Sequence, residues 1–418
     1  MTTSTARTRP GAARGLTPYL RLLTATQFAF NTGFYAVLPY LAAHLGDGLG
    51  MAGWLVGLVL GLRTFSQQGL FVVGGVLTDR YGPRPVVLAG CVLRIAGFCW
   101  LAQAGTTGTV IGAVLLIGFA AALFSPAVES ETVRAAVGHE TGTGTPRAQV
   151  LAVFSAAGQA GAFLGPLLGS LLLLLGGDFR TACLAGAVVF VGVLAGHARL
   201  MPRRPRRVRT GPTEAVPLRQ VFANRPFLVL CLAYSTYLVS YNQLYLALPA
   251  EVERATGSQS ALGGLFALSS LLVVAAQLPL TRWSAHRVAP RTALVAGLAV
   301  VAAGFAAVPL APDGPAGLLP GALLVVLLTL GQMLLVPAAR GLVPDLVDDR
   351  RLGLATGALS SVSGLAVLVG SAATGTLLDA PGPVLWTVLA AVPLAGAVLS
   401  LTLPIGRRTP EPGTAVTD

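Results

Sequence analysis

Two arginines lie inside long apolar runs of this sequence, where a charged side chain is unfavourable. Arg63 lies about twelve residues into the run 51–77, and Arg94 lies within the run 86–104. If these runs cross a lipid bilayer, an arginine near the middle costs roughly 2.5–3.5 kcal/mol, so Arg63 must face a cavity or a partner. Its guanidinium group could bind an anionic group there, or serve only as a structural hydrogen-bond donor. Arg94 lies nearer one end of its run, so its side chain could extend towards water.

Uncharged polar side chains gather in three of the apolar runs. Aromatic rings together with amides suit bulky amphipathic organic molecules, including cations that bind to ring faces. The alternative is a structural role, in hydrogen bonds between helices and in an aromatic belt at the membrane surface. The candidates for a substrate cavity, in addition to Arg63, are Gln27, Asn31, Tyr35, Gln67, Tyr234, Tyr237, Tyr241 and Asn242.

Acidic residues are scarce inside the apolar runs. A buried carboxyl group can bind and release a proton, which is the chemistry of a proton-coupled carrier. Glu129 and Glu131, late in the run 109–135, are the candidates for this role. The alternative is a charge pair with Arg134 or Arg84 at the membrane rim. The sequence shows no nucleotide-binding loop, metal-ligand cluster or nucleophile motif, so we expect no catalytic residue, cofactor or metal.

The elements that carry these residues are apolar runs long enough to be membrane-spanning helices. The chain has 418 residues, of which 54% are hydrophobic and 11% charged, whereas soluble domains have about 25% charged residues. A spanning helix needs about 20 mostly apolar residues. Twelve such runs occur, at 18–44, 51–77, 86–104, 109–135, 148–175, 180–200, 226–250, 261–283, 291–310, 317–342, 352–378 and 383–404. The sequence therefore predicts an all-α membrane protein with twelve transmembrane helices.

The arginines indicate how these helices are oriented. The net charge is +12, which in a soluble protein could indicate nucleic-acid binding. Here the arginines gather in alternate loops and in the segment 201–225, which is the pattern of cytoplasmic segments. We therefore expect a multi-pass protein of the plasma membrane with both termini in the cytoplasm, with the lipid bilayer and not nucleic acid as its partner.

A polar linker rich in proline and arginine divides the predicted helices into two sets of six. Short matches recur in the same order on both sides of it, as expected from a duplication. The matches are DRYGPR at 79–84 with HRVAPR at 286–291, FSPA at 124–127 with LVPA at 335–338, and LPYL around Pro39 with LPAE around Pro249. The expected parts are a cytoplasmic tail at 1–17, an N-terminal half at 18–200, the linker at 201–225, a C-terminal half at 226–404 and a second cytoplasmic tail at 405–418.

A charged turn between the second and third runs carries a motif. Its residues are Gly75, Asp79, Arg80, Gly82 and Arg84. Gly82 permits a backbone angle that other residues avoid, and the prolines that follow stop helix propagation. The stretch resembles the loop signature of the major facilitator superfamily, although Pro83 occupies the first slot of the family's basic pair. The resemblance implies a conformational latch built on Asp79 and Arg84, and the alternative is an ordinary turn with a topology-setting charge cluster.

A second motif lies in the run 148–175. Its residues are Gly161, Gly165, Pro166 and Gly169. They resemble a motif characteristic of antiporters in this superfamily, although Ala152 stands where the family has a further glycine. Because proline kinks a helix and glycines allow close packing, the alternative is a kinked helix with no role in the direction of transport.

Most of residues 18–404 resembles the bacterial multidrug-efflux branch of the superfamily, the twelve-helix drug:proton antiporters. The resemblance runs through GLRTFSQQGLFVVGGVLTDRYGPRPVVLAGCVLRIAGF, LFSPA, TRWSAHR and GTLLD. It implies two pseudo-symmetric six-helix bundles and a monomer that exports small organic compounds by alternating access, with protons as the coupling ion. The alternatives are uptake of a nutrient or metabolite, and a non-transporting receptor or scaffold with the same fold.

Overall fold

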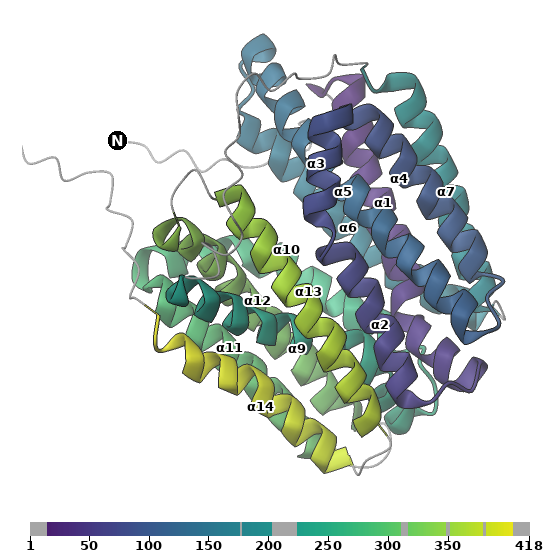
Figure 1. The fold of residues 1–418 in the computed structure, drawn as a ribbon, viewed down its shortest axis with the longest axis vertical. Coiled ribbons are helices and arrows are strands. Elements are labelled where there is room, and N and C mark those ends of the chain that lie inside the picture. Colours follow the sequence, from purple (N-terminus) through teal and green to yellow (C-terminus); the bar gives the residue numbers. More distant parts are fainter. Residues whose placement is uncertain are drawn as a thin grey trace, which may run out of the picture. The chain divides into compact units, whose positions relative to one another are not determined.

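The structure is a computed structural model, and the elements that it describes are all helices. The described residues are 15–175, 178–202, 224–310, 317–347, 352–378 and 382–403. Figure 1 shows the helices α1 (Pro18–Ala43), η2 (His44–Gly48), α2 (Gly53–Gln68), α3 (Phe71–Tyr81), α4 (Pro83–Leu101), α5 (Thr107–Thr143), α6 (Arg147–Leu174), α7 (Phe179–Leu200), α9 (Arg225–Thr256), α10 (Leu262–Arg287), α11 (Pro290–Ala307), η3 (Val308–Leu310), α12 (Leu318–Leu346), α13 (Leu352–Leu377) and α14 (Gly382–Ser400). The all-α fold class predicted from the sequence is confirmed. The predicted linker and the two predicted tails lie largely outside the described residues.

The second predicted span is interrupted. The sequence predicts one helix over 51–77, whereas α2 ends at Gln68 and α3 begins at Phe71. The Gly69 amide still donates to the Phe65 carbonyl, at 2.8 Å, but Leu70, with φ −101° and ψ 5°, leaves the helical conformation. Glycine has little helix propensity, so a break at this point is understandable after the fact.

Two of the long helices are less apolar than the rest. Ten helical segments of the described residues are long and apolar enough to cross a membrane, with α2 and α3 counted together as Gly53–Thr78. The helices α1 and α9, of 26 and 32 residues, are long enough but are not among the ten. These two helices carry most of the polar side chains that the sequence singles out, and those side chains lower their mean hydropathy.

By its internal contacts the chain divides into two compact units. The first unit contains residues 1–38 and 70–209, and the second contains residues 39–69 and 210–418. In the described residues, the first unit therefore holds α3 to α7 with the beginning of α1. The second unit holds α2 and α9 to α14 with the end of α1. Residues 39–69 group with the second unit because α2 packs closely along α13.

A row of glycines brings α2 and α13 into direct contact within the second unit. Gly53, Gly57 and Gly61 are spaced by four residues, so they share one face of α2. A Cβ atom at Gly57 would collide with the Ser371 carbonyl oxygen, and one at Gly61 would lie 2.8 Å from the Leu368 Cα. Since the obstacles are backbone atoms, this interface has no room for a side chain on α2.

Proline positions repeat between the two halves of the sequence. Pro39 lies inside α1 and Pro249 inside α9, while Pro126 lies inside α5 and Pro337 inside α12. Each pair belongs to one of the short matches found in the sequence. The structure therefore places the repeated prolines inside equivalent helices of the two halves, α1 with α9 and α5 with α12.

Arg84 and Arg291 repeat as well, and they make the same contact in their two units. Each follows the proline that begins its helix, α4 or α11. Arg84 donates from Nη2 to the Ala198 carbonyl near the end of α7, at 2.6 Å. Arg291 donates from Nη1 to the Leu403 carbonyl just beyond α14, at 3.0 Å. A cation at the end of a helix satisfies its last carbonyls and complements its dipole, so both arginines act as caps.

Replacement of Arg291 by glutamine is expected to destabilise the second unit by about 1–2 kcal/mol, because a charge-assisted hydrogen bond to a carbonyl is lost. The measurement is the melting temperature of the purified protein in one detergent. Arg287→Gln, an exposed arginine at the end of α10, is the matched control and should change little. Equal melting temperatures for the two variants would contradict the capping role.

Candidate functional site

Arg63 is buried in the second unit and takes part in a polar network. The residue is 7% exposed. Its Nη2 donates to Oγ1 of Thr64 at 2.7 Å, and its Nη1 donates to Oε1 of Gln67 at 3.3 Å. The Thr64 hydroxyl lies 3.2 Å from Oδ1 of Asn242 on α9. The structure therefore brings three predicted cavity residues, Arg63, Gln67 and Asn242, into one network.

The network continues from α9 to α13. Asn242 donates from Nδ2 to Oγ of Ser371 at 2.7 Å, and Gln243 donates from Nε2 to Oγ1 of Thr374 at 3.2 Å. All four residues are at most 3% exposed. The sequence prediction missed Ser371 and Thr374, although they are polar residues in the predicted run 352–378 and so carry the same signal that selected Asn242.

Tyrosine rings form a continuous row along α9. The ring centroids of Tyr234 and Tyr237 are 5.6 Å apart, those of Tyr237 and Tyr241 are 5.9 Å apart, and those of Tyr241 and Tyr245 are also 5.9 Å apart. The Tyr237 hydroxyl donates to Oε1 of Gln332 on α12 at 2.9 Å. Tyr234, Tyr237 and Tyr245 are buried, and Tyr241 is partly exposed. The row leaves one ring partly accessible, and its role towards a substrate stays a prediction.

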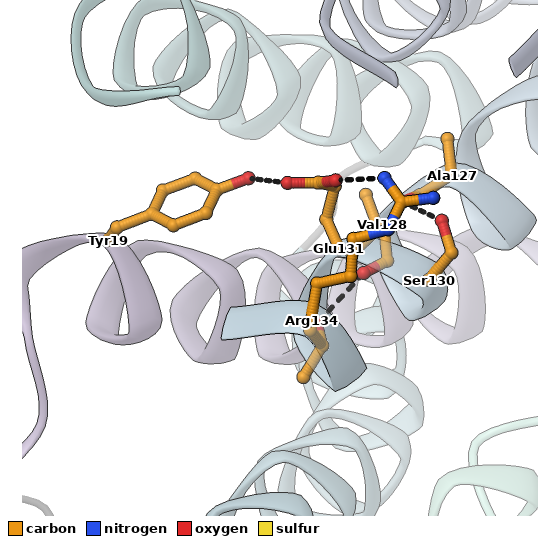
Figure 2. Close-up of polar contacts among 7 residues, drawn as sticks. Tyr19, Ala127, Val128, Ser130, Glu131 and Arg134 are labelled. Carbon is orange, nitrogen blue, oxygen red and sulfur yellow. Dashed lines mark hydrogen bonds and ion pairs between the residues drawn. The ribbon is translucent and has the colours of Figure 1, made fainter. Parts of the chain in front are cut away.

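Glu131 is the buried carboxylate of the first unit. Figure 2 shows its carboxylate between the Tyr19 hydroxyl, which donates to Oε2 at 3.1 Å, and the Arg134 guanidinium, whose Nη1 donates to Oε1 at 2.8 Å. Glu131 is 0% exposed, whereas the side chain of Arg134 is 38% exposed. The charge pair with Arg134 that the sequence offered as an alternative is therefore present. Glu129, the other predicted proton-binding candidate, is exposed.

Arg94 does not extend towards water, although its place near one end of its run allowed that. The residue is 1% exposed, and its Nη1 donates to the Ile117 carbonyl of α5 at 3.0 Å. Its Cζ atom lies 4.9–5.7 Å from the ring centroids of Phe30, Phe34, Phe98 and Phe190. These rings come from α1, α4 and α7, so one cation joins four helices of the first unit. Cation–π contacts compensate the lost hydration.

The polar candidates of α1 lie close to α6 within the first unit. Asn31 donates from Nδ2 to the Gly158 carbonyl at 2.8 Å. A Cβ atom at Gly158 would lie 3.2 Å from the Gln27 side chain, and one at Gly165 would lie 2.8 Å from the Tyr35 Cβ. Gln27, Asn31 and Tyr35 therefore line the contact between α1 and α6, and their role towards a substrate stays a prediction.

The antiporter-like motif forms this glycine face of α6. A Cβ atom at Gly161 would collide with the Phe28 carbonyl oxygen of α1. Gly165, Pro166 and Gly169 are buried, and α6 continues through Pro166 as one helix. The motif therefore supports close packing of α1 on α6, while its role in the direction of transport stays a prediction.

The loop motif is described in part. Gly82 has φ +85°, a backbone angle that residues other than glycine avoid, as the sequence predicted. Arg80 lies over the Tyr81 ring at 5.4 Å, and in the described structure no atom lies within 4 Å of a Cβ built on Gly75. The side chain of Asp79 lies outside the described residues, so the latch stays a prediction. Arg84 instead provides the cap on α7.

A family model described as Major Facilitator Superfamily matches residues 22–319 and 230–417, which together cover most of the chain. The chain belongs to the major facilitator superfamily. The resemblance stated for its two motifs is thereby confirmed at the level of the family. As a member of this superfamily it is a multi-pass membrane protein of a transporter family.

Two relatives within the superfamily match over most of their length. An uncharacterized MFS-type transporter of Mycobacterium tuberculosis is 38% identical over 379 residues, which cover 88% of this chain and 87% of the relative. The multidrug resistance protein MdtH of Aeromonas hydrophila is 32% identical over 341 residues, covering 79% of this chain and 83% of that protein.

Two solved structures of transporters share the fold. A mutant of the peptide transporter POT in complex with sulfate superposes with a TM-score of 0.77 at 15% identity, covering 93% of this chain and 96% of that chain. The nucleoside transporter NupG superposes with a TM-score of 0.75 at 14% identity, covering 91% and 98%. At these identities the likeness shows the fold alone.

Proposed function

We propose that this protein exports small organic compounds, drug-like molecules or metabolites, across the cytoplasmic membrane by alternating access, with protons as the coupling ion. The relative MdtH is named a multidrug resistance protein and is 32% identical over 79% of this chain. That relationship supports export of organic compounds over uptake of a nutrient.

The observation that supports proton coupling is the buried environment of the Glu131 carboxylate. The Glu131 carboxylate is 0% exposed and accepts hydrogen bonds from a phenol and from a guanidinium that is 38% exposed. A proton can neutralise it while the charge of Arg134 stays within reach of water. Protonation would release Arg134 and weaken the contact between α1 and α5. A proton on Glu131 therefore changes the packing of the first unit, which is what a coupling site must do.

The cargo contacts that we propose are the Arg63 network and the tyrosine row of the second unit. The guanidinium supplies charged donors, Asn242 and Gln67 supply amides, and Tyr241 supplies a partly exposed ring face. A flat organic molecule with a polar edge would match this combination.

The remaining proposals follow from the sequence. Both termini and the linker 201–225 lie in the cytoplasm, because arginines gather in those segments. Six helices, residues 18–200, precede the linker and six, residues 226–404, follow it. Asp79 acts as a latch, and the protein works as a monomer.

Glu131→Gln is expected to abolish the gradient-dependent part of export. Glutamine keeps the size and the hydrogen bond to Tyr19 but cannot carry a proton at neutral pH. Cells with and without the protein are loaded with a panel of fluorescent dyes, ethidium among them, and accumulation is measured before and after a protonophore collapses the proton gradient. The parent should lower accumulation only while the gradient exists.

The matched control is Glu140→Gln on the same helix, whose carboxylate lies 3.9 Å from Nε of Arg147 and is 39% exposed. It should export like the parent. Export that resists the protonophore would exclude proton coupling, and equal export by Glu131→Gln and the parent would exclude Glu131. A panel in which no compound is moved would favour a receptor or scaffold over an exporter.

A further inference from the structure

A buried histidine in the first unit lies outside the site described above. His197, near the end of α7, is 0% exposed. Its Nε2 lies 3.0 Å from Oγ1 of Thr26 on α1, and its ring meets the Phe124 ring of α5 edge-on, with centroids 6.2 Å apart. The imidazole therefore lies where three helices meet.

The second ring nitrogen of His197 has no hydrogen-bond partner among the described residues. Its Nδ1 is buried, and the Thr26 hydroxyl satisfies only Nε2. A neutral imidazole needs one donor and one acceptor partner, whereas an imidazolium carries two N–H donors. Among the described residues, the packed site offers an acceptor, the Thr26 hydroxyl, for only one of these two donors. The site therefore favours the neutral ring, whose second nitrogen can still bind a proton.

Among the described residues, the charged groups of the neighbouring helices offer the His197 ring no ion-pair partner. From α4, Arg84 donates to the carbonyl of Ala198, the residue next to His197, and Arg94 contacts Phe190, two turns earlier on α7. From α5, the nearest carboxylate by register is Glu131, seven residues beyond Phe124 and so roughly 10 Å along the helix. From α1 the facing group is the uncharged Thr26. Burial without a charged partner among the described residues therefore favours a neutral His197 while the helices are packed.

We propose that His197 is a second proton-binding residue of this transporter. The ring is neutral while α7 is packed on α1, and it takes a proton from water when this contact opens and Nδ1 reaches solvent. The neutral ring thus holds α7 and α1 together, and the protonated ring holds them apart. This inference rests on the proposed proton coupling and adds a site, distinct from Glu131, that couples the proton to a helix contact.

The direct test follows the ring itself and needs no cargo. The chain has four histidines, so protein labelled with ¹⁵N-histidine in lipid nanodiscs gives few ring signals, and His197 is identified by the signal lost in His197→Gln. As the pH falls from about 8 to about 3, the His197 ring of the parent should convert from one neutral tautomer to imidazolium. Thr26→Val removes the one acceptor for the cationic ring, so its midpoint should move to lower pH by up to about one unit.

A ring that stays neutral over this whole range in the parent would overturn the proposal, as would a midpoint that Thr26→Val leaves unchanged. A second measurement connects the ring to transport. Dye export into proteoliposomes is measured at several internal pH values with a constant pH difference across the membrane. The parent rate should change across the His197 midpoint, whereas the rate of His197→Gln should stay flat.

The two proposals fail in different ways. Loss of gradient-driven export in Glu131→Gln, together with a flat pH profile for His197→Gln, supports both. Export by the parent without a gradient removes the proposed function and leaves the ring titration to decide on His197. A His197→Gln profile that follows the parent's removes the histidine alone.

Discussion

Replacement of Gly57 by leucine is expected to abolish transport and to lower the melting temperature more than any surface substitution. The Ser371 carbonyl of α13 occupies the place that a Cβ atom would take at Gly57. Because the obstacle is backbone, the two helices must separate. Overpacking of this kind costs about 1–3 kcal/mol, occasionally more.

Two variants make this test sharp. Gly192→Leu is the matched control, because Gly192 is an exposed glycine of α7 with no described atom within 4 Å of an added Cβ; it should melt and transport like the parent. Gly57→Ala should lie between the parent and Gly57→Leu, since one methyl group forces a smaller separation. Melting temperature is read in detergent and transport by dye accumulation. If Gly57→Leu matched Gly192→Leu in both, the close packing of α2 on α13 would be wrong.

The helices of this protein could be predicted from the sequence because hydropathy is a local quantity. The run 180–200 became α7, Phe179–Leu200, and the run 352–378 became α13, Leu352–Leu377. The break between α2 and α3 was missed although Ser66, Gln67 and Gln68 precede it, because apolar residues resume at Leu70. Glycine is frequent in all the runs, and its frequency gives no sign of which glycine interrupts a helix.

The surroundings of the functional candidates could not be predicted in the same way, because the contacts are far apart in sequence. Glu131 pairs with Arg134 three residues away, which the sequence offered as an alternative, but its second partner, Tyr19, is 112 residues distant. His197 meets Thr26 across 171 residues. No spacing rule reaches across such distances without an alignment or a structure.

The repeated sequence indicated which positions of the two halves are equivalent, but not which residues they contact. The recurrence of Pro-Arg at 83–84 and 290–291 indicated equivalent turns. The structure adds that each arginine caps the helix three spans further along its own unit. Arg84, a residue of the predicted latch, therefore also has a structural contact. A test of the latch should change Asp79 and not Arg84.

Arg94→Lys is expected to destabilise the first unit more than Arg94→Met, although lysine keeps the charge. An arginine inside the membrane costs roughly 2.5–3.5 kcal/mol. Against this stand the bond to the Ile117 carbonyl and four ring contacts at 4.9–5.7 Å, each worth about 0.5–2 kcal/mol. The contacts together outweigh the cost, so the parent is the most stable form.

The order of the two variants follows from hydration. Methionine loses the ring contacts and the bond to Ile117, but it also removes the charge, so we expect a loss of about 1–3 kcal/mol. Lysine retains a compact and strongly hydrated charge that cannot spread over four rings, so its cost in a dry site is larger. Melting temperatures of the purified variants in one detergent decide the order, with the exposed Arg199 of α7, changed in the same two ways, as control. A lysine variant as stable as the parent would mean that water reaches this position and that the aromatic cage is not what holds the cation.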